Sequence, residues 1–210
     1  MYKVFFKSKP LIFTTSDQIE EDNGILIDSK SSKYSSLIKI LKSKSNNSVY
    51  FYNPDPNKLL NHFEKCFLTI DAAGGMVLND FNKYLLIFRN NKWDLPKGHL
   101  KKKELNLEGA SREVQEETGV NNLNPISILP TTYHFVKKNK KYKVKKTRWF
   151  LFNTKFKGDL IPQLDEGIVK VEWKTKSEIK KCLPQMYPNI KNLFENHFTQ
   201  SLTELGTSDL

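Results

Sequence analysis

The chain has 210 residues and a formal net charge of +11, with 38% hydrophobic and 12% aromatic residues. This balance excludes a disordered chain and fits one sizeable domain accompanied by a small second unit. No apolar run approaches the length that crosses a membrane, and the first residues lack the apolar core and cleavage site of a secretory signal. We therefore expect a cytoplasmic protein without a membrane partner.

Residues 1–65 are predicted to form a small α+β unit. Its strands are expected at YKVFF, PLIFTT, GILID and VYFYN, and its helices at SSLIKILKS and NKLLNHFEK. Ten lysines stand against seven acidic residues, so the charge is nearly balanced and gives no nucleic-acid signature. Because this unit has no catalytic constellation, we expect it to pack on the following domain or to mediate a homodimer.

Residues 66–200 are predicted to form the main domain, followed by a loose tail at 201–210. Its strands are expected at CFLTI, GGMVL, KYLLIFR, ISILPTTYHFV, KTRWFLFNT and IVKVEWKT. The lysine-rich NKK between the fourth and fifth of these is predicted to be a hairpin turn. Helices are expected at three places: Asn106–Thr118, Lys176–Cys182 and Pro188–Gln200.

The first of these helices has clear ends and a polar face. Asn106 is the predicted N-cap, and Gly119 stands where a left-handed residue ends a helix. Apolar residues at spacings of three and four predict a buried stripe of Leu107, Ala110 and Val114. Three carboxylates share an adjacent face: Glu113, Glu116 and Glu117.

Carboxylates at these spacings repel one another, so a positive partner is expected. Hard oxygen ligands on one rigid element are what Mg²⁺ or Mn²⁺ prefers, and Mg²⁺ usually shares its shell with substrate phosphates. Taken alone, however, the three glutamates favour a solvated acidic helix face over a metal site. The neighbouring residues decide between these interpretations.

A longer pattern begins at Gly98 and contains the three glutamates. It runs Gly, five residues, Glu104, seven residues, Arg112, Glu113, an aliphatic residue, one residue, Glu116, Glu117, one residue, Gly119 and an aliphatic residue. This spacing matches every position of the signature of the Nudix hydrolases, which residues 98–120 therefore resemble. The order of the predicted strands extends the resemblance to about residues 66–200.

The resemblance implies an α/β fold, a Nudix-type α/β/α sandwich with a mixed sheet, preceded here by the small α+β unit. It also implies cleavage of a diphosphate bond in a nucleoside diphosphate linked to another group, with Mg²⁺ as cofactor and Mn²⁺ as a substitute. Carried over by position, Glu116 and Glu117 would be metal ligands, and Glu113 a further ligand or the base that deprotonates water.

Other matched positions would shape the site. Arg112 and Glu104 would pair and fix the loop on the helix, whereas Gly98 would allow the backbone turn that presents the Lys97 carbonyl to metal. Lysine and arginine side chains near the reacting phosphates would stabilise negative charge.

The substrate is predicted from a shorter stretch, WDLPKGHL at 93–100, which is similar to the subgroup that hydrolyses dinucleoside polyphosphates. Lys97 or His99 would contact phosphate; alternatively, both side chains are solvated. Tyr133 is expected either to stack on a base or bond phosphate, or to be a core tyrosine.

Two further segments offer candidates. Lys145 and Arg148 lie on opposite faces of a regular strand, so at most one lines the substrate site. In LDEGIVKVEW, at 164–173, either Asp165 or Glu166 would add an acidic group from a loop, and we favour Glu166 because of its distance from the following tryptophan. An ordinary acidic turn is the alternative.

Two classes of function follow. The first is a Mg²⁺-dependent hydrolase of nucleotide or polyphosphate substrates, with dinucleoside polyphosphates first and nucleoside triphosphates or RNA 5′-triphosphate ends next. The second is a nucleotide-sensing or nucleic-acid-binding regulator without turnover, suggested by the extra unit and the basic charge. We favour the hydrolase over a nucleic-acid partner because the set of three glutamates is complete.

Overall fold

The computed structural model describes residues 3–19 and 23–206, which divide into two compact units. Unit 1 contains Met1–Ile70 together with Tyr133–Lys146, and unit 2 contains Asp71–Thr132 together with Thr147–Leu210. The sequence placed the first boundary near residue 65, but it did not reveal that a distant hairpin tip belongs to unit 1. That assignment depends on contacts between residues far apart in the chain.

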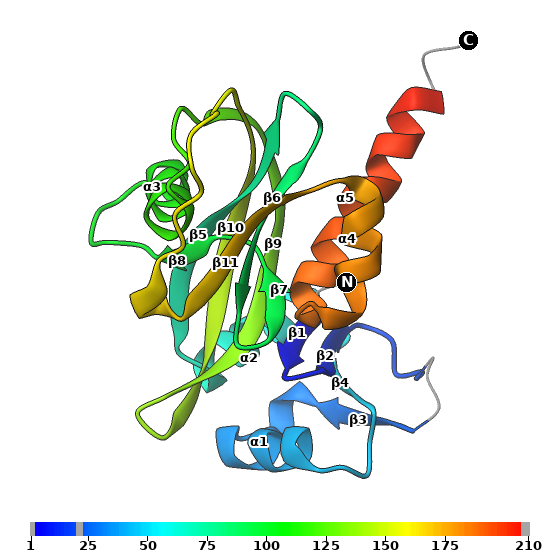
Figure 1. Cartoon of the computed structure of the whole chain (residues 1–210). Coiled ribbons are helices and arrows are strands. Elements are labelled where there is room, and N and C mark those ends of the chain that lie inside the picture. Colours follow the sequence, from blue (N-terminus) through cyan, green and yellow to red (C-terminus); the bar gives the residue numbers. More distant parts are fainter. Residues whose placement is uncertain (1–2, 20–22, 207–210) are drawn as a thin grey trace. The chain divides into compact units, whose positions relative to one another are not determined.

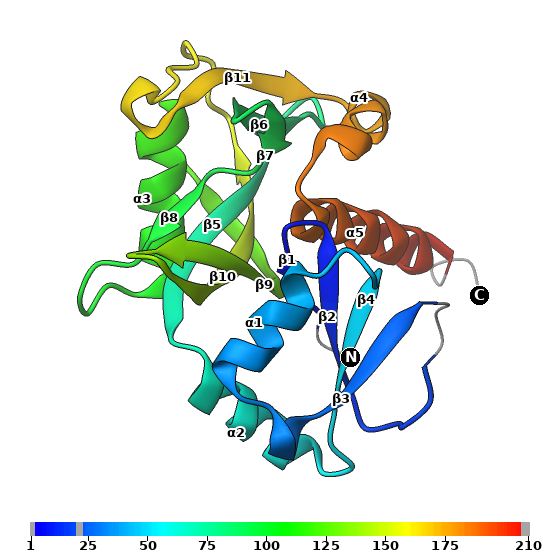
Figure 2. The ribbon, with the colours of Figure 1, turned by 90° about the horizontal axis from the view of Figure 1, so that it is seen from below.

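Unit 1 contains four strands and two α-helices of the N-terminal segment (Figure 2). They are β1 Lys3–Phe6, β2 Lys9–Thr14, β3 Gly24–Asp28, α1 Tyr34–Lys42, β4 Ser48–Tyr52 and α2 Pro56–Cys66, with the short helix η1 at Ser29–Ser31. The six larger elements confirm those predicted from sequence. β1 and β2 are antiparallel, whereas β4 lies between β2 and β3 and is parallel to both, so the sheet is mixed.

The core of unit 1 explains why the hairpin tip belongs to it. Phe135 and Val144, from the tip, are buried in the same cluster as Phe67, and the rings of Phe135 and Phe67 lie 4.9 Å apart. The tip also adds a strand, because residues 4 and 5 of β1 pair in parallel with residues 133 and 134. The two residues at its turn, Asn139 and Lys140, have positive φ angles, which confirms the predicted hairpin turn and shows that it has two residues.

Unit 2 is a sheet with helices on both faces (Figure 1). Its elements are β5 Thr69–Asn79, β6 Tyr84–Arg89, β7 Lys92–Asp94, β8 Lys97–His99, α3 Asn106–Thr118, β9 Asn124–Lys138, β10 Lys141–Thr154, η2 Leu164–Glu166, β11 Ile168–Lys174, α4 Lys176–Cys182, η3 Leu183–Gln185 and α5 Pro188–Gly206. The strand order is β11-β6-β5-β10-β9, with β7 paired to β6 and β8 to β5. The tips of β9 and β10 continue into unit 1.

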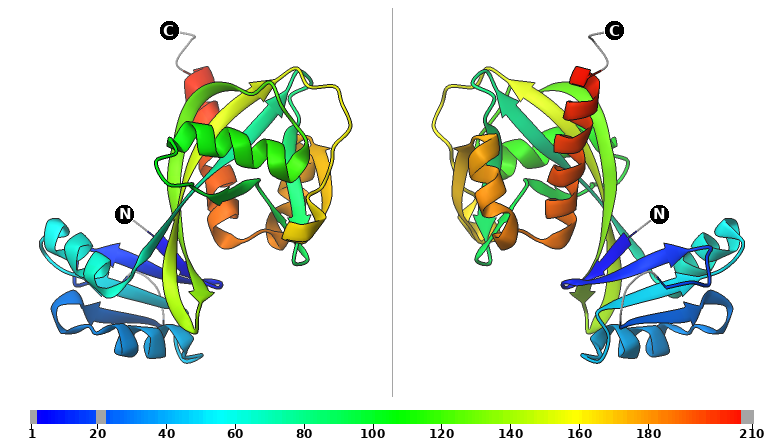
Figure 3. Two further views of the ribbon diagram at one scale, coloured as in Figure 1. Left: turned by 90° about the vertical axis from the view of Figure 1, so that its left-hand side faces the viewer. Right: turned by 90° about the vertical axis from the view of Figure 1, so that its right-hand side faces the viewer.

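Alternation along the strands divides the apolar residues of unit 2 between two cores. On β10, Trp149 and Leu151 pack with α4 and α5, whereas Phe150 and Phe152 pack with Ala110 of α3. Figure 3 shows α3 in front of the sheet and α5 behind it in its left-hand view. The predicted α/β/α sandwich is therefore confirmed, and the sheet holds α3 against one face.

Three of the elements in the structure differ from those predicted from the sequence. The two strands expected at CFLTI and GGMVL are one strand, β5, and Cys66 ends α2 instead. The three-residue strands β7 and β8 were not predicted because they are too short to show a period. The tail expected at 201–210 is helical through Gly206 as part of α5, and residues 207–210 lie outside the described residues.

Within the described ranges, no helix is both long and apolar enough to span a membrane.

Candidate active site

Helix α3 has the predicted bounds and places the acidic residues beside β8. Gly119 has a φ of 77° and ends the helix in the left-handed conformation, as expected. Ala110 and Val114 are fully buried, but Leu107 is 37% exposed and does not belong to the stripe. The N-cap is Leu105 and not Asn106; its N–H donates to the carboxylate of Glu108 over 3.4 Å.

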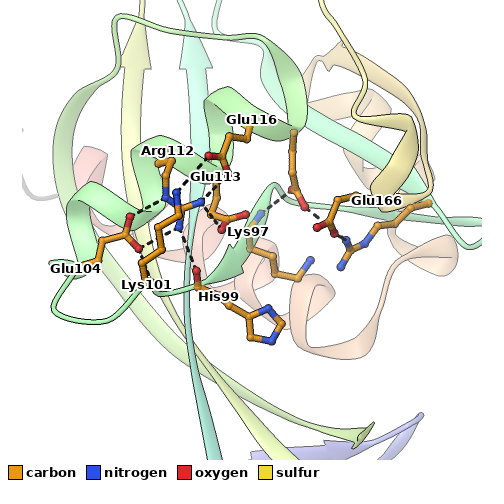
Figure 4. Close-up of polar contacts among 10 residues, drawn as sticks. Lys97, His99, Lys101, Glu104, Arg112, Glu113, Glu116 and Glu166 are labelled. Atoms are coloured by element: carbon orange, nitrogen blue, oxygen red, sulfur yellow. Dashed lines mark hydrogen bonds and ion pairs between the residues drawn. The ribbon is translucent and has the colours of Figure 1, made fainter.

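Arg112 lies at the centre of the acidic residues (Figure 4). Its Nε and Nη2 donate to the two carboxylate oxygens of Glu104 at 2.7 and 3.0 Å, which is the pairing that the resemblance implied. Nη2 also donates to the His99 carbonyl at 3.1 Å. The hydrogen bond from Arg112 holds the pKa of Glu104 at about 2, so this carboxylate is charged at neutral pH and anchors the loop on α3.

The same guanidinium supplies the positive charge that Glu113 and Glu116 require. Its Nη1 donates to Glu113 over 2.7 Å and to Glu116 over 2.6 Å, so the two carboxylates converge on one nitrogen (Figure 4). Glu116 is 45% exposed, whereas Glu113 is largely buried. Burial raises the pKa of Glu113, and the Arg112 guanidinium opposes that shift.

Gly98 makes room for this arrangement. A Cβ added at Gly98 would lie inside the van der Waals radius of the Glu113 carboxylate. The glycine is thus required by the close approach of an acidic side chain to the β8 backbone.

Glu117 differs from the other two glutamates because its side chain is only 1% exposed. The sequence placed all three on one face, but Glu117 points toward the sheet. Its carboxylate accepts from the Lys97 backbone N–H over 2.8 Å and lies 3.5 Å from an Arg89 nitrogen. Burial raises the pKa of Glu117 to about 7, and the positive charges of Lys97 and Arg89 oppose that shift.

Arg89, at the end of β6, is a site residue that the sequence analysis missed. Its guanidinium lies 3.6 Å from Asp94, 3.5 Å from Glu117 and 3.8 Å from Glu166. It therefore connects the buried carboxylates with the η2 loop that carries Glu166. The only signal in the sequence was a single arginine closing an apolar strand, which is too common to be specific.

The side chain of Lys97 was predicted to contact phosphate or to be solvated, and the structure contradicts both placements. It is 4% exposed, and its ammonium donates to Asp94 and, over 3.1 Å, to the Leu95 carbonyl. Burial lowers the pKa of Lys97. The ion pair between the Lys97 ammonium and Asp94 stabilises the β7–β8 turn in the interior. The Lys97 side chain therefore does not contact phosphate. That the Lys97 carbonyl binds metal stays a prediction.

The other substrate-binding candidates fall in different places. His99 is exposed on β8, and Arg148 of β10 lies 3.3 Å from both Asp71 and Asn106. Tyr133 and Lys145 belong to unit 1, where Tyr133 packs against the apolar core and Lys145 is 8% exposed. Within unit 2, the structure thus brings the glutamates of α3, Glu104, Glu166 and the β8 turn together. That Tyr133 or Lys145 contacts substrate stays a prediction.

The donor set is compatible with a hard divalent cation. In the described part of the chain, no three acidic, histidine or cysteine side chains already converge in a metal-binding geometry. Nevertheless, Glu113 and Glu116 present oxygens to a single cationic nitrogen, and a divalent ion would offer the same oxygens a stronger positive charge. The residues therefore fit a divalent metal ion.

A model of the NUDIX domain matches residues 68–196, more than half of the sequence. The chain belongs to the Nudix family, whose hydrolases act on pyrophosphate bonds and generally use divalent metal ions. The matched range leaves the first 67 residues outside, which agrees with an additional N-terminal unit.

Solved structures are similar over the same part of the chain. A MutT protein from Methanosarcina mazei Go1 is 22% identical with a TM-score of 0.51, over 64% of this chain and 96% of that one. A NUDIX hydrolase from Nitrosomonas europaea is 25% identical with a TM-score of 0.49, over 63% and 90%. An Ap4A hydrolase from C. elegans is 20% identical with a TM-score of 0.46, over 64% and 98%. The similarity to the Methanosarcina mazei protein supports the fold described for unit 2.

Proposed function

We propose that this protein hydrolyses a diphosphate bond in nucleoside polyphosphates with Mg²⁺, for which Mn²⁺ can substitute, and that dinucleoside polyphosphates are its preferred substrates. The observation that carries the proposal is the convergence of Glu113 and Glu116 on Arg112, with Glu117 buried beside Arg89. We keep a cytoplasmic location and a homodimer as part of this proposal.

In this mechanism Glu116 and Glu117 would hold the metal ion, with Glu113 as a further ligand or as the base. The ion would supply positive charge that neutralises phosphate oxygens and favours deprotonation of the attacking water. Glu113 is the first candidate for the base, because it lies beside Glu116 on the Arg112 guanidinium and burial raises its pKa. Glu166 is the second, since it reaches the site from a separate loop and lies near Arg89.

Charge around the carboxylates has two further roles. Arg112 stays bonded to Glu104 through Nε and Nη2, so its Nη1 can release an acidic partner without the loop losing its anchor. Arg89 offsets the buried negative charge of Glu117 and Asp94. Arg112 and Arg89 thus offset part of the negative charge that the three glutamates would bring to a metal ion.

The dinucleoside polyphosphate preference rests on the similarity of WDLPKGHL to that subgroup, and here its residues form the β7–β8 turn. Nucleoside triphosphates, oxidised ones included, and RNA 5′-triphosphate ends are the next substrates. A sensor without turnover is the alternative, and the complete set of glutamates speaks against it.

Product identification tests the proposal. The protein is incubated with Mg²⁺ and diadenosine polyphosphates, nucleoside triphosphates, ADP-ribose or 5′-triphosphorylated RNA, beside the Glu117→Gln variant. Glu108→Gln is the matched control, because Glu108 is an exposed glutamate of the same helix. We expect asymmetric cleavage of a dinucleotide, lost with Glu117→Gln and kept with Glu108→Gln. Cleavage only of another substrate would overturn the preference, and tight binding without any turnover would overturn the hydrolase.

A further inference from the structure

The net charge is divided very unequally between the two units. Unit 1 holds ten lysines in residues 1–70 and seven in residues 133–146, no arginine and seven acidic residues, so it carries +10 of the +11 charge of the chain. Unit 2, which contains the catalytic glutamates, is left with +1. The balanced charge predicted for the N-terminal segment was correct for that segment, but the hairpin tip makes the folded unit strongly basic.

Part of this charge surrounds a pocket of about 570 Å³ in unit 1. Four lysines line it, Lys7, Lys9, Lys42 and Lys44, and among the residues that the structure describes no acidic residue does. Within residues 3–19 and 23–206 none of the four forms an ion pair with a carboxylate. Like charges gathered around one pocket without a counter-charge favour an anionic ligand.

Lys9 is held in place at the base of this arrangement. Its ammonium donates to the Ser43 carbonyl and, over 3.1 Å, to the Oδ1 of Asn46, which is 2% exposed. The Nδ2 of Asn46 is bonded in turn to the Ser48 carbonyl. Burial lowers the pKa of Lys9, and no carboxylate opposes that shift. The protein therefore positions a partly buried cation with neutral oxygens only.

The aromatic ring of Tyr142 also lines the pocket. Tyr142 comes from the hairpin tip, its N–H donates to the Tyr34 hydroxyl over 2.7 Å, and its ring packs on Phe6 at 4.9 Å between centroids. The Lys42 ammonium lies 5.1 Å from the centroid of the Tyr142 ring. Basic side chains beside a fixed aromatic ring are the combination that binds single-stranded nucleic acids.

We propose that unit 1 binds a single-stranded nucleic acid, with phosphates contacted by Lys7, Lys42 and Lys44 at the pocket and Tyr142 beside them. An extended polyanion is favoured over a free nucleotide because the charge of unit 1 exceeds what the pocket holds. Four exposed lysines of the hairpin tip supply more of it: Lys137, Lys138, Lys140 and Lys141. A lipid surface is disfavoured because the exposed lining is lysine, serine and asparagine, without an exposed large apolar side chain.

Binding is measured by fluorescence anisotropy with a labelled oligouridylate of roughly 12 nucleotides, in EDTA so that no hydrolysis occurs. The pocket variant is Lys7→Gln with Lys42→Gln and Lys44→Gln. Lys9 is left unchanged because its hydrogen bonds stabilise the loop. The matched control removes the same charge from unit 2 at three exposed lysines: Lys155, Lys157 and Lys181.

For the wild type, the logarithm of the binding constant should fall with the logarithm of salt concentration with a slope steeper than about −2, because the three phosphate contacts at the pocket alone contribute about −2. The pocket variant should lose about two from that slope and at least about tenfold in affinity, with wild-type turnover and melting temperature. The control should bind like the wild type.

Several results would overturn the proposal. They are no binding of the oligonucleotide, equal losses in the two triple variants, or an unchanged salt slope in the pocket variant. Full competition by equimolar ATP would show that the ligand is a nucleotide and not a strand. Equally tight, lysine-dependent sedimentation with phosphatidylserine vesicles would assign the surface to a membrane instead.

Discussion

At the scale of single residues, the site depends on close approaches that leave no room for change. Gly98 lies under the Glu113 carboxylate, and Glu104 receives two hydrogen bonds from Arg112. Both contacts fix where the acidic side chains of α3 point. A substitution at Gly98 therefore tests the position of Glu113, and a substitution at Glu104 tests the ion pair with Arg112.

We predict that Gly98→Ala abolishes most activity. The new methyl group would overlap Glu113, so the carboxylate must move away from Glu116 and Arg112. Overpacking of this kind costs about 1–3 kcal/mol of folding free energy, which urea denaturation would measure. A variant with wild-type turnover would contradict the placement of Glu113.

We predict that the folding stability depends on pH through Glu104, whose pKa is lowered from 4.5 to about 2, mainly by the hydrogen bond from Arg112. A lowered folded-state pKa contributes stability above pH 4.5, and that contribution is lost as the pH falls through about 2. The wild type should therefore melt at a higher temperature than Glu104→Gln at pH 7, and the difference should shrink below pH 4.5. A difference that stays constant down to pH 3 would contradict the ion pair.

At the scale of elements, the ends of helix α3 determine how its glutamates are presented. Gly119 closes the helix with a φ of 77°, and a Cβ there would lie 3.2 Å from Ile161. Gly167 has a similar φ of 74° but no atom within 4 Å of an added Cβ. An alanine at Gly167 would therefore introduce backbone strain alone, whereas an alanine at Gly119 would add a close contact with Ile161.

We predict that Gly167→Ala loses about 1 kcal/mol of stability, the cost of a left-handed alanine, and that Gly119→Ala loses more. Chemical denaturation of both variants measures the difference. Equal losses would show that the contact with Ile161 has no effect on the end of α3.

The elements that sequence predicted well are those with local signals. Helices α3 and α4 have the predicted bounds, because glycine and apolar spacing act within a few residues, although the N-cap of α3 was predicted one residue too late. The role of Arg89 was missed because only the fold brings Glu117 near it. The orientation of Lys97 was missed because sequence spacing does not show that the turn buries its ammonium against Asp94. The exposed Leu107 shows the same limit, because apolar spacing does not reveal where the sheet ends.

At the scale of the whole molecule, the N-terminal segment and the hairpin tip share one core. Phe135 is 9% exposed and Val144 is fully buried, and both pack in the cluster formed by residues of β1, β2, α1 and α2. A chain without residues 1–65 would expose these side chains to water. The sequence did not reveal this because 64 residues lie between Ile70 and Phe135.

We predict that deletion of residues 1–65 makes the remaining chain self-associate, as light scattering coupled to size-exclusion chromatography would show. A second deletion that also replaces residues 133–146 with Asn-Gly should associate less, because the apolar tip is gone. A first deletion that stays monodisperse and fully active would contradict the shared core.

The central claim is that cleavage requires a divalent metal ion held by the glutamates of α3. The most direct measurement is the initial rate of diadenosine tetraphosphate hydrolysis against Mg²⁺ concentration, for the wild type and Glu116→Gln. We predict no rate in EDTA, saturation with Mg²⁺ for the wild type, and a loss of at least about 100-fold in the variant. A rate that persists in EDTA, or a variant as fast as the wild type at every Mg²⁺ concentration, would contradict the claim.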